Sequence, residues 1–326
     1  MRTKVLSLCA AAVLATSFAQ AASAASLTVA GISQGFSLST FVSSIPSNGA
    51  VGPVGITFLG SNSVMISSYA TGLIQTYTDV DGQTPGTAVN GSNFGGNNPA
   101  GLANLNGTIY VALQGSGRID QLNSNGTFNH QLAGFFPSAT GLVADAFTGH
   151  LYVSEIGSGP IFEVDPVTGL AVGSGFGGNA DGLTLSSDGS TLYAEINSHI
   201  LGFNTTTHNQ VFDSGFIPGG ADGVAFGSGS LAGQLFVNTN SGQVIEVDET
   251  TSAQTVIVTG GSRGDFVSVD PFTNTLLLTQ TDSILRLTPP SNGGFVPVPL
   301  PAAVWSGLAL LGAVGGLSFI NRRRIA

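Results

Sequence analysis

The sequence predicts an all-β fold, a six-bladed β-propeller, on three observations. A strand-rich segment recurs six times, and its equivalent anchor positions are 46, 40, 41, 41 and 43 residues apart. Each copy contains short apolar runs separated by turn residues. Only 8% of the residues are charged whereas 47 are glycine, which suits strands and tight turns better than long amphipathic helices. The anchor positions are Gly55, Gly101, Gly141, Gly182, Gly223 and Phe266.

Each repeat divides into four expected strands. The fourth repeat shows the plan clearly, with strands at 182–185, 191–196, 199–204 and 210–216 and an Asp-Gly turn between the first two. A period of about 40 to 45 residues with four strands per unit is typical of a propeller blade. A β-helix or a two-sheet sandwich is the alternative, although hairpin turns and a 41-residue period fit neither well.

The sixth repeat has only three expected strands, at 265–270, 275–280 and 283–288. A strand-like segment, 26–42, precedes the first repeat. We expect this N-terminal segment to complete the last blade, because closing the ring pairs sheet edges that an open array would expose. The sequence therefore predicts one propeller domain over residues 26–290.

The first 24 residues are typical of a secretory signal peptide. A basic start with Arg2 and Lys4 precedes an apolar stretch, 5–19, and small residues with A-x-A cleavage options follow. The only cysteine, Cys9, lies within this predicted signal helix, so the mature chain would contain no thiol. We therefore expect a protein that is exported across the inner membrane.

A Pro-rich linker, 291–301, leads to a C-terminal segment, 302–326, that we expect to form a transmembrane helix with a basic tail. The uncharged stretch 302–320 would span about 29 Å as a helix, close to the thickness of one hydrocarbon core. Arginines that follow at once would hold that end in the cytoplasm. The tail consists of Arg322, Arg323 and Arg324.

The order of motif, apolar helix and arginine cluster resembles the VPLPA-type variant of the PEP-CTERM sorting signal. The motif residues are Val298, Pro299, Leu300, Pro301 and Ala302. The resemblance implies a Gram-negative-type bacterium that makes exopolysaccharide, with an exosortase, a membrane cysteine protease, as the processing partner. Leu300 stands where the common form of the signal has Glu, and a plain membrane anchor is the alternative. Both interpretations place the body at the cell surface or outside the cell, at least transiently anchored in the membrane.

The repeats themselves, in the phrases LYVSEIGSGPIFEVDPVTG and GLTLSSDGSTLYAE, resemble NHL, YVTN and gluconolactonase-like propeller repeats over residues 53–288. This resemblance implies the fold and not one activity, because many functions share the ring. The gluconolactonase-like family holds a metal in the channel with Glu, Asn and Asp. In this chain the first glutamate is Glu155, so the early blades offer no glutamate ligand.

The body between residues 25 and 300 is strongly acidic. It contains all 18 acidic residues but only three basic ones, which gives it a formal charge of −15. Such a surface repels nucleic acid and anionic lipid, and it tolerates divalent cations. The three basic residues of the body are Arg118, Arg263 and Arg286.

Candidate metal ligands precede three of the anchor positions. Asp181, Asp222 and Asp265 open the first strands of neighbouring blades, and the first strand of a propeller blade lines the central channel. Converging carboxylates could hold Ca²⁺ near one mouth of the channel. The competing interpretation is that each Asp accepts backbone N–H bonds within its own turn. A weaker second set ends the second strands of the third to fifth repeats: Glu155, Glu195 and Asn238.

These features favour an exported, non-enzymatic propeller that binds a partner, either exopolysaccharide or a surface protein. The alternative is a metal-dependent lactonase, another hydrolase or a lyase with its site in the channel. A third interpretation is a purely structural component of the matrix. None of the four histidines has metal-ligand spacing with another, and we assign no catalytic residue. The tripeptide Arg263-Gly264-Asp265 matches a cell-adhesion sequence, and we interpret this match as coincidence.

Overall fold

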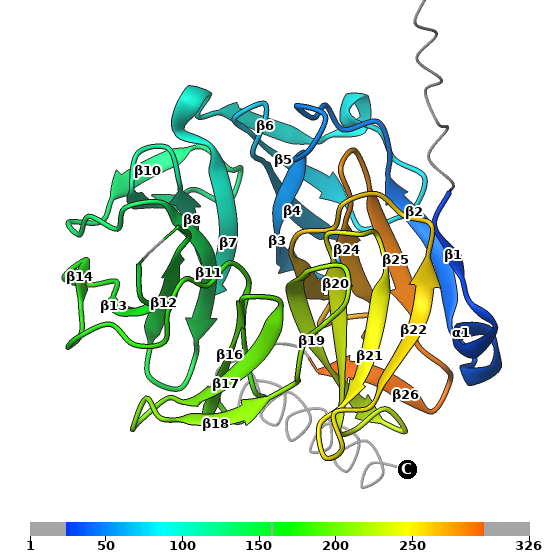
Figure 1. The fold of residues 1–326 in the computed structure, drawn as a ribbon. Helices are drawn as coiled ribbons and strands as arrows, with labels where there is room; N and C mark the ends of the chain where they lie inside the picture. The colour runs from blue at the N-terminus through cyan, green and yellow to red at the C-terminus, as the bar shows by residue number, and fades with distance from the viewer. Residues whose placement is uncertain (1–23, 158, 297–326) are drawn as a thin grey trace, which may run out of the picture.

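A ring of six β-sheets makes up the protein in the computed structural model, which describes residues 24–157 and 159–296 (Figure 1). The innermost strands of successive sheets contact one another, and the innermost strand of the last blade contacts that of the first. The ring is therefore closed. The predicted all-β, six-bladed propeller is confirmed.

Each blade is an antiparallel sheet whose strands follow one another outward from the channel. Blade one consists of β3 (Pro53–Gly60), β4 (Ser63–Ser68), β5 (Leu73–Thr78) and β6 (Asn90–Asn93). Blade two consists of β7 (Pro99–Leu105), β8 (Thr108–Leu113), β9 (Arg118–Leu122) and β10 (Phe128–Gln131). Blade three consists of β11 (Ala139–Asp145), β12 (His150–Glu155), β13 (Phe162–Asp165) and β14 (Leu170–Ala171). Two single 3₁₀ turns, η1 (Pro85–Thr87) and η2 (Gly95–Asn97), flank β6.

The last three blades continue the same plan. Blade four consists of β15 (Leu183–Leu185), β16 (Thr191–Ile196), β17 (His199–Asn204) and β18 (Gln210–Asp213). Blade five consists of β19 (Ala221–Gly229), β20 (Gln234–Thr239), β21 (Val244–Asp248) and β22 (Gln254–Thr259). Blade six consists of β23 (Val267–Val269), β24 (Leu276–Thr279), β25 (Ile284–Thr288) and β2 (Ser37–Val42). In the fourth blade the second and third strands have the predicted bounds, while β18 ends at Asp213 and not at residue 216.

The N-terminal segment closes the ring with its second half only. Strand β2 pairs antiparallel with β25 and is the outermost strand of blade six. The expectation that all of 26–42 joins this blade is wrong for its first half. There, β1 (Ser26–Leu27) pairs with β22 of blade five, and α1 (Val29–Gln34) follows. The Thr28 side chain caps the helix by accepting the Gly31 N–H, and Gly35 ends it at φ 89°, a left-handed conformation that favours glycine.

A loop of blade one covers the outer edge of the closing strand. The backbone N–H groups of Gly82 and Gln83 donate to the carbonyls of Thr40 and Phe41, both over 2.9 Å. The N–H of Ser43 donates in return to the carbonyl of Gln83 over 3.0 Å. An unpaired edge strand invites association with other chains, and this loop removes that hazard at the seam of the ring.

Blade five has two additional strands. Besides β1 at its outer edge, β26 (Gly293–Val296) pairs with the far half of β19. Phe295 of this strand is buried, and its ring lies 4.9 Å from the Phe236 ring and 6.5 Å from the Phe36 ring. The segment 291–301, expected to be a linker, therefore begins as part of the ring, because Phe295 has an apolar site to fill.

The anchor glycines are explained by the close approach of the next blade. A Cβ atom on Gly55, Gly141 or Gly182 would lie 2.2–2.3 Å from a carbonyl oxygen of the following blade. No side chain fits at such a distance. Glycine therefore recurs in the sequence because the same close contact between neighbouring blades recurs around the ring.

Side chains on the second strands add hydrogen bonds between blades. The hydroxyl of Ser67 donates to the Ala100 carbonyl of blade two over 2.5 Å, and that of Ser154 donates to the Asp181 carbonyl of blade four over 2.7 Å. Apolar side chains fill the remaining space. Between blades three and four, for example, the Phe176 ring packs edge-on against Tyr152 and Phe203.

The two predicted address segments fall almost wholly outside the described residues. This applies to the signal peptide up to residue 23 and to the sorting motif, membrane helix and arginine tail over 298–326. Within the part that the structure describes, no helix is long and apolar enough to cross a bilayer. The address segments therefore remain predictions.

Candidate binding site at the channel mouth

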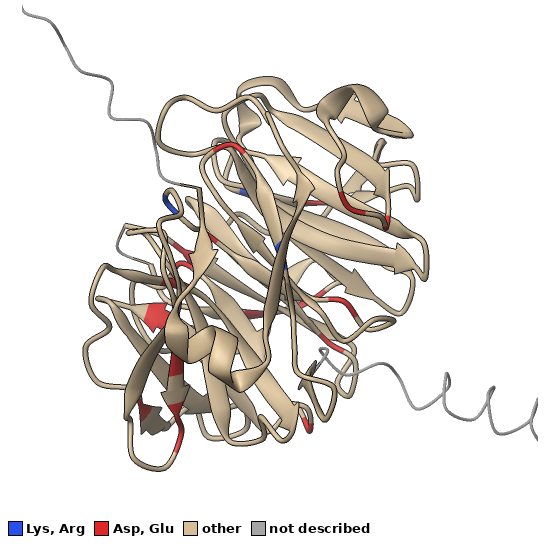
Figure 2. Cartoon of the chain, turned by 90° about the vertical axis from the view of Figure 1, so that its right-hand side faces the viewer, with Lys and Arg blue, Asp and Glu red and all other residues tan. Residues whose placement is uncertain are grey.

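Basic residues are rare in the ring (Figure 2). Each arginine that the structure describes is paired with aspartate. Arg118 pairs with Asp120 of its own strand. Arg263 and Arg286 each meet carboxylates of more than one chain segment. Buried ion pairs between different segments of the chain therefore lie around Arg263 and around Arg286.

The channel mouth has an apolar part and an acidic part. Val54, Ala100 and Phe266, at the starts of the first strands of blades one, two and six, form a small buried cluster. The equivalent positions before the anchors of blades four and five are Asp181 and Asp222, and the residue before Phe266 is Asp265. One end of the channel thus has a buried apolar cluster beside carboxyl groups.

The structure brings the three candidate aspartates to one place, around a guanidinium group. Nη2 of Arg263 lies 2.6 Å from Oδ1 of Asp265 and 3.6 Å from Oδ2 of Asp222. Asp222 and Asp265 are buried, while Asp181 retains some exposure. We call these four residues together with Asn238 and Asn240 the channel cluster.

Two neighbours fix Arg263 in this position. Its Nε donates to Oδ1 of Asn240 over 2.6 Å. The next residue, Gly264, passes so close to Asn238 that a Cβ atom would lie 2.3 Å from Oδ1 of that side chain. Arg263 and Asp265 pair with each other, so both charged side chains of the Arg-Gly-Asp tripeptide take part in the channel cluster.

Burial and mutual repulsion raise the pKa values of the clustered carboxyl groups. Burial, with Asp265 and Glu195 as nearby negative charges, raises the pKa of Asp181 to about 7. Burial raises the pKa of Asp265 to about 6, against the opposing effect of Arg263. The pKa of Asp222 is raised well above its ordinary value, first by burial and then by Asp181 and Asp265. The cluster therefore holds protons near neutral pH.

Three buried oxygen atoms of the channel cluster have no hydrogen-bond partner in the described residues. They are Oδ1 of Asp222, Oδ2 of Asp265 and Oδ1 of Asn238. The amide nitrogen of Asn238 is used, since it donates to the carbonyls of Asp265 and Thr279 over 3.2 and 2.9 Å. The Asn238 oxygen is an acceptor, and the oxygens of Asp222 and Asp265 are acceptors when their carboxyl groups are ionised.

Oxygen acceptors of this kind are the ligands that Ca²⁺ takes, as the sequence predicts. The side chains nevertheless surround Arg263, whose guanidinium supplies the positive charge between Asp222 and Asp265. Across the described stretches, no group of three or more His, Cys, Asp and Glu side chains is arranged to hold a metal ion. Binding of Ca²⁺ by Asp181, Asp222 and Asp265 would require Arg263 to move, and it stays a prediction.

Two glutamates of the weaker set lie near the same mouth. Burial raises the pKa of Glu195 to about 7, against an N–H from Ser198 that reaches Oε1 over 2.7 Å. Burial also raises the pKa of Glu155, and its Oε1 has no partner within the described chain. Sequence reasoning found these residues but missed the role of Arg263. The scarcity of basic residues was the available signal.

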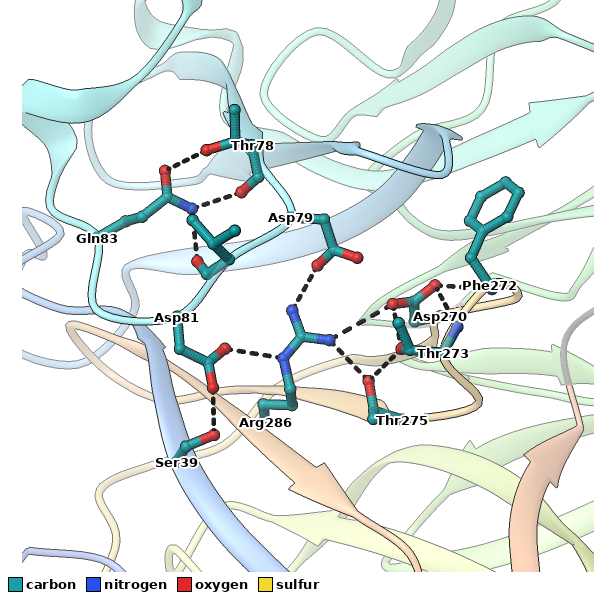
Figure 3. A network of polar contacts seen from close by, with 11 residues as sticks. Ser39, Thr78, Asp79, Asp81, Gln83, Asp270, Phe272, Thr273, Thr275 and Arg286 are labelled. Carbon is teal, nitrogen blue, oxygen red and sulfur yellow. Dashed lines mark hydrogen bonds and ion pairs between the residues drawn. The ribbon is translucent and has the colours of Figure 1, made fainter.

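A second polar cluster joins the ends of the ring (Figure 3). Arg286 of β25 pairs with Asp79, with Asp81 through Nε over 2.8 Å, and with Asp270 through Nη1 over 3.4 Å. Nη1 also donates to the Thr275 hydroxyl over 2.7 Å. We call these five residues the closure cluster, because Asp79 and Asp81 belong to blade one and the others to blade six.

Comparison with known proteins supports the fold. No family model matches the chain, and no curated protein is similar to it. A gluconolactonase from Xanthomonas campestris is 14% identical, and the match covers 81% of this chain and 94% of that one with a TM-score of 0.62. An inactive variant of virginiamycin B lyase from Staphylococcus aureus, solved with quinupristin, is 15% identical. That match covers 78% of this chain and 99% of the lyase, with a TM-score of 0.50. At these identities the likeness shows the fold alone.

Proposed function

We propose that this protein is an exported binding protein of the bacterial cell surface or exopolysaccharide, with a ligand site at the channel mouth. The supporting observation is the set of three buried, unpartnered acceptor oxygens on Asp222, Asp265 and Asn238. A buried acceptor without a partner costs about 1–3 kcal/mol, and a ligand that supplies the partner recovers part of this cost. Ligand binding is therefore favoured next to these three oxygen atoms.

The chemistry of the site indicates a cationic ligand. When Asp222 and Asp265 are ionised, all three free atoms accept hydrogen bonds, so a ligand that brings N–H donors or a positive charge satisfies them and favours release of the protons held there. An organic ammonium ion would supply both N–H donors and the positive charge. Ca²⁺ is the inorganic alternative, coordinated by the same oxygens once Arg263 is displaced.

Calorimetric titration of the full-length protein with butylamine and, separately, with CaCl₂ tests this proposal. We expect saturable heat with at least one of them, and its loss when Asp222 and Asp265 are both changed to Asn. Asp282→Asn is the matched control, since Asp282 is exposed and lies outside the channel cluster. Absence of heat with both ligands, together with an unchanged Tm, would reject a cationic ligand at this mouth.

A second candidate function is catalysis in the channel, by a metal-dependent lactonase, another hydrolase or a lyase. Asp181 and Glu195 support it, because groups with a pKa of about 7 exchange protons readily at neutral pH. A bound divalent cation would polarise a substrate carbonyl. Two enzymes, the gluconolactonase and the lyase named above, share the fold.

A hydrolysis screen with lactones and glycans, with and without Ca²⁺, tests this second function. Any activity in the channel should fall at least about a hundredfold in Asp181→Asn, the range expected for loss of a general acid or base. The Asp282→Asn control should retain it. Activity that survives Asp181→Asn unchanged would exclude this carboxyl group from the reaction.

The export part of the proposal depends on the two address segments and is tested in cells. We expect the protein in the surface or extracellular fraction, shortened at the C-terminus by an exosortase-type protease. Deletion of residues 298–326 should remove this processing. Full-length protein found only in the cytoplasm would contradict the proposal.

A further inference from the structure

A pocket of about 440 Å³ lies between the outer strands of blades one and two. Blade one contributes the end of β6 and the turn after it, and blade two contributes β9 and the start of β10. These strands lie at the periphery of their sheets, away from the innermost strands that surround the channel. The pocket is therefore separate from the channel cluster.

Two aromatic rings line this outer pocket from neighbouring blades. Phe94 is partly buried against the apolar cluster that contains Met65 and Ile74, so its ring is held in place. Phe128 at the start of β10 is 52% exposed. The turn before it fits tightly against blade one, since a Cβ atom on Gly126 would lie 3.3 Å from Ile74. A flat apolar ligand face can pack against both rings.

Donors and acceptors alternate around the rings. Oδ1 of Asn93 accepts the Gly95 N–H over 2.7 Å, which leaves its amide nitrogen for a ligand. Nδ2 of Asn97 donates to the Phe94 carbonyl over 2.7 Å, which leaves its oxygen. The buried hydroxyl of Ser92 has no hydrogen-bond partner among residues 24–157 and 159–296. Such a mixture suits hydroxyl groups, each of which both donates and accepts.

The pocket carries no net charge of its own. Arg118 reaches it, but Nε and Nη2 of Arg118 pair with both carboxylate oxygens of Asp120 over 3.1 and 3.2 Å. Asp120 is fully buried, and burial raises its pKa against the opposing effect of Arg118. The N–H groups at Nη1 of Arg118 remain for a ligand. The formal charge of −15 on the body opposes an anionic one.

We propose that this outer pocket binds a neutral, hydroxyl-rich sugar unit of a polysaccharide chain. The pyranose ring packs its C–H face on Phe94 and Phe128, while Asn93, Asn97 and Arg118 bind its hydroxyl groups. The pocket is open at the periphery of the ring, so a polymer chain can enter and leave it. The inference rests on the proposed function only in taking exopolysaccharide as the source of the sugar.

Calorimetric titration of the full-length protein with cellohexaose, a neutral hexasaccharide, tests the inference. We expect saturable binding in the millimolar range or tighter, and a loss of about tenfold in affinity in Phe128→Ala. Phe135→Ala is the matched control, because Phe135 is 72% exposed and lies outside the pocket lining. It should bind as the unchanged protein does. Oligogalacturonate of the same length should bind more weakly, because its carboxylates meet the acidic body.

Three results would overturn the inference. They are no saturable heat with cellohexaose, equal losses in Phe128→Ala and Phe135→Ala, or tighter binding of oligogalacturonate than of cellohexaose. The Asp222→Asn, Asp265→Asn double variant should bind cellohexaose normally. A failure of the channel proposal and a failure of the outer pocket are therefore distinguishable.

Discussion

The channel cluster and the closure cluster are built from the same parts but differ in how completely they are satisfied. In each, one arginine lies between carboxylates of different blades. In the closure cluster, Arg286 donates through all three of its nitrogens. In the channel cluster, one oxygen of Asp222 and one of Asp265 have no partner in the described chain.

This difference separates structure from function. Arg286 is buried, contacts the Phe41 ring at 5.1 Å and binds the two ends of the ring together. The surplus of acceptors over donors around Arg263 is unfavourable for the isolated protein and is the property that a ligand site requires. A buried ion pair by itself therefore indicates neither role, and the count of unsatisfied atoms distinguishes them.

Replacing Arg286 should produce the largest effect. Arg286→Met removes the positive charge and leaves Asp79 and Asp270 buried without it, at a cost of about 3–5 kcal/mol in the free energy of unfolding. Urea titration followed by circular dichroism measures this cost. Arg286→Lys keeps the charge but not the three-sided contact. Its loss in the free energy of unfolding should therefore lie between zero and the loss for Arg286→Met. A loss below about 1 kcal/mol for Arg286→Met would show that the closure cluster does not hold the ring.

Replacing Arg263 should cost less, about 1–2 kcal/mol at neutral pH. The carboxyl groups of Asp181 and Asp265 already have raised pKa values, so they can take up protons when the guanidinium is lost. The same urea titration on Arg263→Met gives the value. If Arg263→Met costs as much as Arg286→Met, the distinction between the two clusters is wrong.

The pH dependence of stability sharpens the comparison further. A carboxyl group whose pKa is raised in the folded state binds more protons folded than unfolded, so its contribution is present at low pH and is lost as pH rises through the folded value. For Asp181 and Asp265 these values are about 7 and about 6. At about 1.4 kcal/mol per unit of pH for each group, the free energy of unfolding should therefore fall by about 4 kcal/mol between pH 5 and pH 7.5.

Burial also raises the pKa of Asp79 in the closure cluster, which adds to this slope in the same direction. Asp181→Asn isolates the share of the channel cluster, because it removes the carboxyl group whose pKa burial raises to about 7. We expect a flatter pH profile in this variant, measured by urea titration at each pH. An unchanged slope would assign the pH dependence to other groups.

Ser39→Ala should have the smallest effect. The Ser39 hydroxyl on the closing strand donates to Oδ2 of Asp81 over 2.6 Å at the exposed side of the closure cluster. Asp81 keeps its contact with Arg286, so the loss should be about 0.5–1 kcal/mol. Thermal unfolding is sensitive enough to measure it. A larger loss would mean that the closing strand depends on this single bond.

The sequence predicts the repeat correctly but not the contacts between distant repeats. The anchor glycines indicate five of the six blades, since each one reflects a local approach of the next blade. By contrast, Asp81 and Arg286 are 205 positions apart, and only ring closure shows that they meet. The helix α1 was missed because a six-residue helix between Thr28 and Gly35 has too few residues to show a helical period.

The placement of the closing strand also determines when the molecule can become compact. Strand β2 is made near the beginning of the chain, and its partner β25 is made near the end. Until β25 is available, β2 has no sheet to join, and a chain cut short before Thr288 has an open seam accessible to proteases. Completion of synthesis and acquisition of protease resistance are therefore expected to be coupled.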